Sequence, residues 1–295
     1  MVMDELQIEA GGWPPSTGGR GFAQVDVFGE QPGRGNPVAV VIEGEGLDDA
    51  AMQAFAAWTN LSETTFLLAP TTHGADYRLR IFTPHRELPF AGHPTLGSAH
   101  AWLERGGSPE HEGVVVQECG AGLVTLRRRE SGLAFAAPPT THGGDVEPGL
   151  LERLIRGLRI DAVDVVASQW VDNGPGWVAV LLPNAEAVLA IDPDAAVLGG
   201  LEVGVVGAHP DGAPEAFEVR AFATGSDGIY EDPVTGSLNA SLGQWLIKTG
   251  RAPVRYRARQ GTRLGKQGVV HIEYVANDLW VGGATTTLIS GTVTL

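Results

Sequence analysis

Two short phrases of the sequence carry residues suited to acid–base chemistry, and the two phrases resemble each other. "GHPTLGSAHA" stands at residues 92–101, and "EDPVTGSLNA" stands at 231–240. A shift of 139 residues aligns His93 with Asp232, and it also aligns the Pro, the Gly-Ser pair and the last Ala. Each phrase is typical of a helix start, with Asp232 as N-cap and Pro233 as first helical residue. The sequence therefore predicts two matched helix starts, one with an imidazole and one with a carboxylate.

A third candidate, Glu63, lies between the end of a predicted helix and the start of a predicted strand. The hydroxyls of Ser62 and Thr64 could hydrogen-bond its carboxyl group, and an apolar strand follows it. A carboxyl enclosed by apolar walls has a raised pKa, which suits a group that both takes and returns a proton. The simpler interpretation is a solvated carboxylate, and these residues alone leave both interpretations open.

The other candidates also have structural alternatives. Beside a helix N-terminus an imidazole tends to stay neutral, so His93 could relay a proton, or the local backbone could simply satisfy its ring. Asp232 could orient a substrate amine or hydroxyl or pair with His93, whereas a plain N-cap needs no further function. Ser237 could bind substrate through its hydroxyl, but "TGSLN" lacks the G-x-S-x-G elbow of a nucleophile.

Composition excludes several classes of function. The 295 residues carry a formal net charge of −15, which argues against a nucleic-acid partner. The basic stretch at 251–266 is expected to be a solvated strand face with alternating charges. Cys119 is the only cysteine, so neither an intrachain disulfide nor a cysteine-based zinc site can form, and we expect it to be buried in a strand. No set of His, Asp and Glu has metal-binding spacing, so we expect no metal.

The N-terminal residues 1–20 are acidic and then rich in glycine and proline, unlike a secretion signal. They are expected to form a flexible leader. No apolar run approaches the roughly 18 residues that suggest a membrane span. We therefore expect a cytoplasmic protein with no membrane partner.

Short apolar runs and alternating patterns predict a chain dominated by strands. The predicted strands cover residues 22–28, 37–42, 64–69, 76–82, 113–118, 122–128, 133–136 and 177–182. The predicted helices cover residues 48–58, 94–104 and 233–249, with a weaker one at 192–200.

The order of these elements occurs twice along the chain. Residues 80–82 (RIF) and 220–222 (RAF) lie 140 residues apart, and so do residues 38–40 and 178–180, both VAV. A repeat this long indicates a duplicated domain. Two like domains normally pack about a pseudo-twofold axis, which would oppose the two helix starts. Their unpaired N–H groups and positive dipole ends would suit an anion, most simply a carboxylate.

Four motifs in this order closely resemble the PhzF family of phenazine-biosynthesis-like proteins: "GNPVAVV", "NLSETTFLL", "FTPHRELPFAGHPTLGSAH" and "GSDGIYEDPVTGSLNASLGQWL". The resemblance extends from Phe22 to Leu295. It implies the diaminopimelate-epimerase-like α+β fold, in which each of two pseudo-symmetric domains wraps a β-barrel-like sheet around a central helix. It also implies an active site in the interdomain cleft, acid–base isomerisation without a cofactor, and a homodimer in many members.

The resemblance assigns roles residue by residue. Glu63 of "SET" would be the proton-shuttling acid/base, and His93 and Asp232 would be the other catalytic residues. Gly92, Gly236 and Ser237 would contact the substrate. Epimerases of this fold carry a cysteine at each helix start, and since His93 and Asp232 are expected there, two-thiol racemisation is excluded.

The chain departs from the family's "QG…GR" stretch, where Lys266 follows Gly265. Lysine lacks the fork with which arginine binds a carboxylate, so a substrate contact there is in doubt. We expect an N-terminal repeat domain at 21–130, completed by a strand at 285–295, and a C-terminal repeat domain at 131–284.

The expected function is that of a cofactor-independent isomerase acting on a small carboxylate-bearing metabolite. Glu63 would remove a proton from one carbon and return it to another. An epimerase that inverts a carbon stereocentre is one alternative, and a non-catalytic small-molecule-binding homologue is the other.

Overall fold

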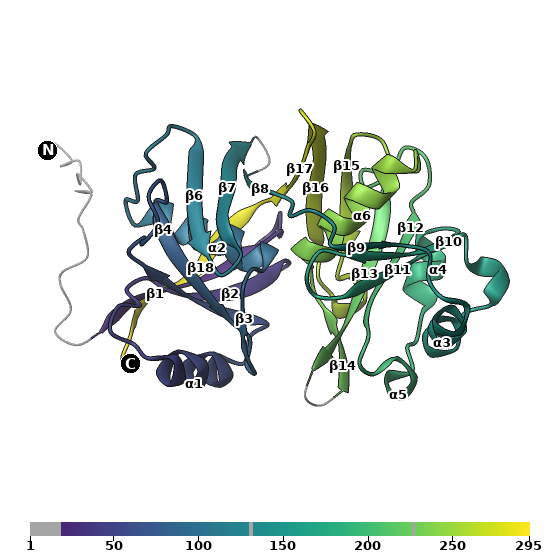
Figure 1. Ribbon diagram of the computed structural model, residues 1–295, viewed down its shortest axis with the longest axis horizontal. Helices are drawn as coiled ribbons and strands as arrows, with labels where there is room; N and C mark the ends of the chain where they lie inside the picture. The colour runs from purple at the N-terminus through teal and green to yellow at the C-terminus, as the bar shows by residue number, and fades with distance from the viewer. Residues whose placement is uncertain (1–18, 130–131, 226–227) are drawn as a thin grey trace, which may run out of the picture.

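A computed structural model describes residues 19–129, 132–225 and 228–295 of the chain. Strands predominate and helices are few, which confirms the α+β class. The elements form two lobes that lie side by side (Figure 1). The prediction of a flexible leader falls mostly outside the described residues, and the proposed domain limits remain a prediction.

The first lobe contains strands β1–β8 and also β18, which comes from the C-terminal end of the chain. Its elements are β1 (Arg20–Val27), β2 (Asn36–Val41), α1 (Asp49–Thr59), β3 (Glu63–Leu68), β4 (Tyr77–Phe82), β5 (Glu87–Leu88), α2 (Gly92–Glu104), β6 (Val114–Cys119), β7 (Gly122–Arg129), β8 (Gly132–Ala136) and β18 (Thr285–Val293). The last strand, β18, pairs antiparallel with β1.

The second lobe contains the remaining elements. These are β9 (His142–Gly144), α3 (Pro148–Leu158), a 3₁₀ turn (Ala162–Asp164), β10 (Ala167–Asp172), β11 (Trp177–Leu182), α4 (Ala185–Ala190), α5 (Ala195–Leu198), β12 (Glu202–Ala208), β13 (Phe217–Gly225), β14 (Gly228–Asp232), α6 (Gly236–Lys248), β15 (Arg255–Gln260), a 3₁₀ turn (Thr262–Leu264), β16 (Gly268–Val275) and β17 (Asp278–Gly283). Pairing of β17 with β8 joins the two lobes into one sheet system.

Each lobe packs its sheet against a long central helix, α2 in one and α6 in the other, and small residues make the close approach possible. A Cβ atom on Gly97 of α2 would lie 2.4 Å from a methyl group of Val38. In the second lobe the glycine is on the strand, because a Cβ atom on Gly204 of β12 would lie 2.4 Å from Leu238 of α6. Both helices are therefore buried on several sides, as the central helix of a wrapped sheet must be.

The predicted strands at 22–28 through 177–182 are all present, with ends shifted by two residues at most. The helix predicted at 192–200 is wrong in its extent, because only α5 lies there and α4 precedes it. The sequence analysis also did not anticipate α3, although a proline at its first position and an apolar stripe mark it. Cys119 ends β6 and is half-buried rather than buried.

The repeat is visible in a pair of matching ion pairs. Arg80 donates to both carboxylate oxygens of Glu87 at 2.7 Å, and its guanidinium lies 5.0 Å from the ring centre of Phe82. In the second lobe Arg220 binds Glu231 at 3.0 and 2.8 Å and lies 4.8 Å from the Phe222 ring. The correspondence of 80–82 with 220–222 therefore holds in three dimensions.

A second sequence correspondence, that of residues 38–40 with 178–180, is wrong by one residue. In the first lobe Val38 pairs with Glu63. In the second lobe the glutamate at the matching position, Glu202, pairs with Trp177 and not with Val178. Val38 faces α2, but Val178 lies in the separate apolar cluster on the other side of its sheet. A shift of one residue moves a strand side chain to the opposite face, so Val38 corresponds structurally to Trp177.

The two helix starts are also farther apart in the sequence than the aligned phrases predicted. Five positions separate the paired residues Phe82 and Glu87, but nine separate Phe222 and Glu231, because the β13–β14 hairpin is longer. The helices, each of 13 residues, consequently begin 144 residues apart rather than 139.

The predicted helix caps, at His93 and Asp232, are also wrong. Ala91 and Thr235 hold the cap positions. His93 lies inside the first turn of α2, and Asp232 is the last residue of β14. The phrase repeat therefore aligned two residues that are not structural counterparts.

The β1–β2 loop fastens the first lobe to the second. The carbonyl of Phe28 accepts from the amide of Val269 at 2.8 Å, and Arg34 donates to the carbonyl of Gly265 at 2.8 Å. Lys266 donates to the carbonyl of Gly33 at 3.1 Å. Since this loop leads directly into β2, it fixes the position at which Asn36 enters the site described below.

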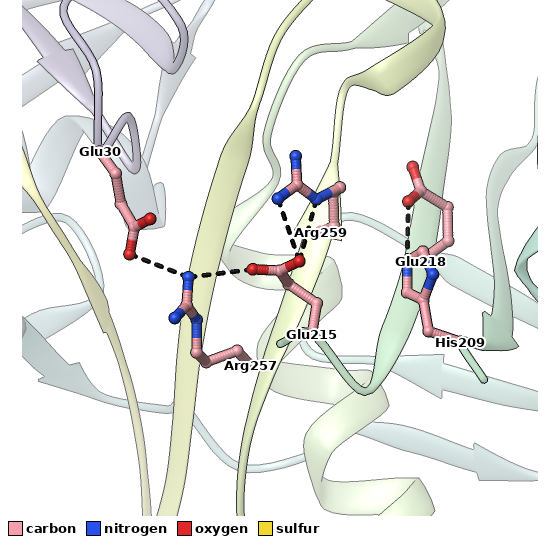
Figure 2. A network of polar contacts seen from close by, with 6 residues as sticks. All are labelled: Glu30, His209, Glu215, Glu218, Arg257 and Arg259. Carbon is pink, nitrogen blue, oxygen red and sulfur yellow. Dashed lines mark hydrogen bonds and ion pairs between the residues drawn. The ribbon is translucent and has the colours of Figure 1, made fainter. Parts of the chain in front are cut away.

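Figure 2 shows the ionic part of this contact. Arg257 of β15 lies 3.0 Å from Glu30 of the loop and 2.9 Å from Glu215, while Arg259 contacts the other oxygen of Glu215 at 3.0 Å. These arginines belong to the basic stretch at 251–266, in which the intervening Tyr256 and Ala258 are buried. The predicted alternation of charged and buried residues is present, and carboxylates of this chain form ion pairs with both guanidinium groups.

Candidate active site

The N-termini of α2 and α6 meet where the lobes join. A Cβ atom on either Gly92 or Gly236 would lie 3.0 Å from the Cα atom of the other glycine. Only glycine permits this approach, because a side chain at either position would collide with the facing backbone. The first turns of both helices have N–H groups without intrahelical acceptors, and both positive dipole ends point to the same region. We call this region, with the side chains around it, the junction site.

Glu63 and His93 form the central pair of the junction site. Glu63 is the first residue of β3, and its Oε2 atom lies 3.2 Å from Nε2 of His93 in the first turn of α2. The His93 side chain is 4% exposed, and that of Glu63 is 14% exposed. Both atoms are fully buried, and within the described residues neither has a hydrogen-bond partner, so the 3.2 Å contact between them is close but not a formed hydrogen bond.

The electrostatics of the pair favour the carboxyl group over the imidazole as the holder of a proton. Burial raises the pKa of Glu63 well above its usual value, and the negative charge of Asp232 raises it further. Burial lowers the pKa of His93 to about 3, although a hydrogen bond to the carbonyl of Pro37 opposes this shift. The burial of both groups therefore favours the neutral imidazole of His93 and works against the ionised form of Glu63.

Asn36, the first residue of β2, links this pair to the second lobe. Its amide nitrogen donates to Oδ1 of Asp232 and to the carbonyl of Val234, both at 3.0 Å, and lies 3.5 Å from Nδ1 of His93. Asn36 is fully buried, so its amide is held in a single arrangement. Sequence reasoning did not single out Asn36. The only signal was its place in "GNPVAVV", because the partners of its side chain lie 57 to 198 residues away.

Asp232 is held by a second buried network. Its Oδ2 atom accepts from the hydroxyl of Thr235, and its main-chain carbonyl accepts from Gln260 at 3.1 Å. Burial raises the pKa of Asp232 to about 6, while hydrogen bonds from Thr235, Asn36 and Ser62 act in the opposite direction. Both carboxylate oxygens of Asp232 therefore already have partners from the chain itself.

Ser237 is the second residue of α6, and residues of the β10–β11 region hold it in place. Its hydroxyl accepts from the indole nitrogen of Trp177 at 3.1 Å, and its carbonyl accepts from the amide of Asn173 at 3.0 Å. Lys266, in contrast, extends to the carbonyl of Gly33 in the β1–β2 loop.

The structure thus brings Glu63, His93 and Asp232 into one connected site and places Gly92 and Gly236 in contact at its centre. In residues 19–129, 132–225 and 228–295, no group of three or more His, Cys, Asp and Glu side chains is placed to hold a metal. The same ranges contain no helix that is long and apolar enough to cross a membrane.

Comparisons with known proteins agree with this architecture. Residues 25–292 match the family model described as phenazine biosynthesis-like protein. A relative from Schizosaccharomyces pombe named Antisense-enhancing sequence 1 is 36% identical, over 92% of this chain and 97% of its own. A Pseudomonas fluorescens relative named trans-2,3-dihydro-3-hydroxyanthranilate isomerase is 32% identical, over 84% of this chain and 88% of its own.

A solved structure described as a predicted epimerase from Pseudomonas aeruginosa superimposes with a TM-score of 0.75 at 27% identity. The superposition covers 94% of this chain and 99% of that one. The family match covers most of the chain, and the relatives include named isomerases and epimerases. The chain therefore belongs to the phenazine biosynthesis-like (PhzF) family and is an isomerase.

Proposed function

We propose that this isomerase moves a proton between two carbons of a small carboxylate-bearing metabolite, without a cofactor and with Glu63 as the acid/base. The observation that carries the proposal is the buried carboxyl of Glu63, whose Oε2 atom lies 3.2 Å from His93 and has no hydrogen-bond partner among the described residues. A buried carboxyl with a raised pKa can both take and return a proton, which is what a proton shuttle requires.

Glu63 supplies both forms of the catalyst. Its carboxylate is a base that takes a proton from one substrate carbon, and the neutral carboxylic acid that this forms delivers the proton to a second carbon, which regenerates the carboxylate. The raised pKa of Glu63 makes its ionised form a stronger base, as removal of a proton from carbon requires. The carbonyl of Pro37 accepts from the imidazole, and Asn36, which donates to Asp232 of the second lobe, lies 3.5 Å from its Nδ1 atom.

The converging helix starts stabilise the charge that develops. Removal of a proton from a carbon next to an unsaturated or carboxyl-bearing centre delocalises negative charge towards the carboxylate. A carboxylate near Gly92 and Gly236 would lie close to backbone N–H groups of two helices and to both positive dipole ends. Ser237, held by Trp177, would add a hydroxyl contact.

A first substrate to test is trans-2,3-dihydro-3-hydroxyanthranilate, because the P. fluorescens relative is named as its isomerase. NMR in D₂O would follow its conversion by the purified protein. Movement of a double bond with deuterium at a new carbon supports isomerisation. Deuterium at the original carbon with inversion supports the alternative, epimerisation.

A non-catalytic binding protein would give a third result. It would bind carboxylates at the junction site but would exchange no substrate hydrogen with solvent, even at protein concentrations above those of the substrate. That result, obtained across a panel of cyclic and amino-acid carboxylates, would contradict the proposed function.

We also propose that the protein works as a homodimer. Leu288 and Ile289 of β18 are 46% and 52% exposed, and a second copy that covers them would bury apolar surface. Light scattering should give twice the mass of one chain, and Ile289→Lys should weaken the association. A monomeric mass for the wild type at micromolar concentration would contradict this.

A further inference from the structure

Thr235 occupies the N-cap position of α6, but its side chain does not cap the helix. A threonine at this position normally accepts a hydrogen bond from an amide N–H group of the first turn, which stabilises the helix. Here the hydroxyl of Thr235 donates to Oδ2 of Asp232 instead. The first turn of α6 therefore does without the partner that its own cap residue could supply.

The amide N–H groups at the two helix starts are consequently available to a ligand. In α6 the amide of Asn239 donates to the carbonyl of Thr235 at 3.1 Å, whereas the three preceding amides, of residues 236–238, have no acceptor in the part of the chain that the structure describes. In α2 the cap residue is Ala91, which has no polar side chain, and Pro94 in the first turn has no N–H group. Both helix starts are thus uncapped, and α6 contributes more of the amides.

Gln260, the last residue of β15, holds the hydroxyl of Thr235 in its observed direction. Its Nε2 atom donates to that hydroxyl at 2.9 Å and to the main-chain carbonyl of Asp232 at 3.1 Å. Its Oε1 atom accepts from the amide of Thr235 at 3.0 Å and from the side chain of Asn239 at 2.8 Å. A main-chain N–H can only donate and a carbonyl can only accept, so these four bonds allow one orientation of the carboxamide. Since the Thr235 hydroxyl accepts from Gln260, its own hydrogen is directed to Asp232.

The sheet fixes the position of Gln260 itself. This residue is fully buried, and it pairs with Val219 of β13 on one side and with Gly268 of β16 on the other. The next residue, Gly261, has a φ of +88°, and a Cβ atom there would lie 2.6 Å from the carbonyl oxygen of Pro233. Glycine allows β15 to end this close to the segment that leads into α6. Gln260 is therefore a rigid support for the start of α6.

We propose that Gln260 is a positioning residue that keeps the start of α6 uncapped for the anionic group of the substrate. It holds the hydroxyl of Thr235 away from the amides of residues 236–238. Without Gln260 this hydroxyl would lose its donor, and a rotation about χ1 would let it accept from one of these amides as an ordinary cap. The helix would gain a cap and the substrate would lose a binding group. The assignment rests on the proposed function for the location of the carboxylate, but it does not require turnover.

A matched pair of probes separates recognition of the negative charge from the general integrity of the site. The probes are cyclohexanecarboxylate and cyclohexanecarboxamide, which share the ring and differ in charge, and calorimetry at pH 8 measures the binding of each. The wild type should bind the carboxylate at least about 10-fold more tightly, as expected for hydrogen bonds to a charged group. Gln260→Met removes the four hydrogen bonds at a similar side-chain volume and should reduce this preference to about 3-fold or less.

A double variant distinguishes positioning from a purely structural role. Adding Thr235→Ala to Gln260→Met should restore the preference to within about 2-fold of the wild type, because alanine has no hydroxyl with which to cap α6. A purely structural role predicts that the second substitution weakens the site further. Gln244→Met is the matched control, because Gln244 lies farther along the same helix and forms hydrogen bonds with Pro138 and Thr140. It should leave the preference unchanged.

Amide NMR signals of the wild type give a second test that needs no substitution, and it applies even if Gln260→Met does not fold. Cyclohexanecarboxylate should shift the signals of residues 236–238, and cyclohexanecarboxamide should shift them less. No binding of the carboxylate, no shift of these signals, an unchanged preference in Gln260→Met or no recovery in the double variant would overturn the assignment. If the preference and its recovery persist but no substrate hydrogen exchanges with solvent, the proposed function fails and the assignment of Gln260 stands.

Discussion

At the scale of single residues, the junction site is a set of buried polar groups with little access to water. Oε2 of Glu63 and Nε2 of His93 lie 3.2 Å apart, and both atoms are buried. Burial makes each charged form unfavourable, which raises the pKa of the carboxyl group and lowers that of the imidazole. The proposed chemistry and the stability of the fold would therefore be linked through the same side chains.

This linkage predicts a pH-dependent effect of Glu63→Gln on stability. The folded protein holds the Glu63 proton at pH values where the unfolded chain has released it, so the wild type loses stability as the pH rises above about 4.3. Glutamine has no proton to lose. The stability of Glu63→Gln relative to wild type should therefore increase with pH, by at most about 1.4 kcal/mol per pH unit.

Urea denaturation of both proteins between pH 5 and pH 8 measures this difference. Glu152→Gln, at an exposed position, serves as the control for removal of a carboxylate. A wild-type and Glu63→Gln difference that stays constant across this range would show that Glu63 titrates as an ordinary surface carboxyl.

At the scale of elements, the site depends on how closely α2 and α6 approach. A methyl group on Gly92 would lie 2.8 Å from the ring of Phe135 and 3.0 Å from the backbone of Gly236. The first contact would displace the ring of Phe135 in β8, and the second would push the helix starts apart. The two glycines thus determine whether one carboxylate can reach both helix N-termini.

Gly92→Ala and Gly236→Ala should each lower the free energy of unfolding by about 1–3 kcal/mol, the usual cost of overpacking. They should also weaken the binding of carboxylate probes. Gly149→Ala is the matched control, because this glycine lies in the first turn of α3 with no atom near the added methyl group. It should be neutral or slightly stabilising. Full stability and probe affinity in Gly236→Ala would contradict the close approach.

At the scale of the whole molecule, the two lobes keep their relative position through the β1–β2 loop and its contacts with the second lobe. Glu215 is 4% exposed and binds two arginines, whereas Glu30 is half-exposed and binds one. Buried ion pairs are costly to break because the remaining charge stays without a partner, but exposed pairs contribute little.

Glu215→Gln should therefore destabilise the protein by about 3 kcal/mol, and Glu30→Gln by less than about 1 kcal/mol. Denaturation at low and moderate ionic strength measures both effects. The reverse order would show that the exposed interlobe pair, rather than the buried anchor, holds the arginines in place.

Much of this arrangement could be predicted from the sequence. Local patterns and motifs predicted the strands, the repeat and the residues Glu63, His93 and Asp232. Alternation, turn residues and helix starts are short-range signals, so they can be recognised in the sequence. The exact correspondence between the lobes could not be predicted. The longer β13–β14 hairpin changes the register by four residues before α6, and the phrase repeat concealed this.

The place of Asn36 in the site was also beyond sequence reasoning. It depends on partners far away along the chain, and asparagine is not an unusual residue at that position. The pairing of Glu202 with Trp177 and not Val178 decides which face it occupies, and a strand's face changes with a shift of a single residue. Such information is contained in the register of the folded sheet.

The most direct test of the central claim compares wild type and Glu63→Gln on trans-2,3-dihydro-3-hydroxyanthranilate in D₂O, followed by NMR. The wild type should form product with deuterium at the carbon that receives the proton. Glu63→Gln should slow this reaction about 10²–10⁴-fold while the binding of carboxylate probes persists. Turnover by Glu63→Gln at the wild-type rate would contradict the assignment of Glu63 as the group that carries the proton.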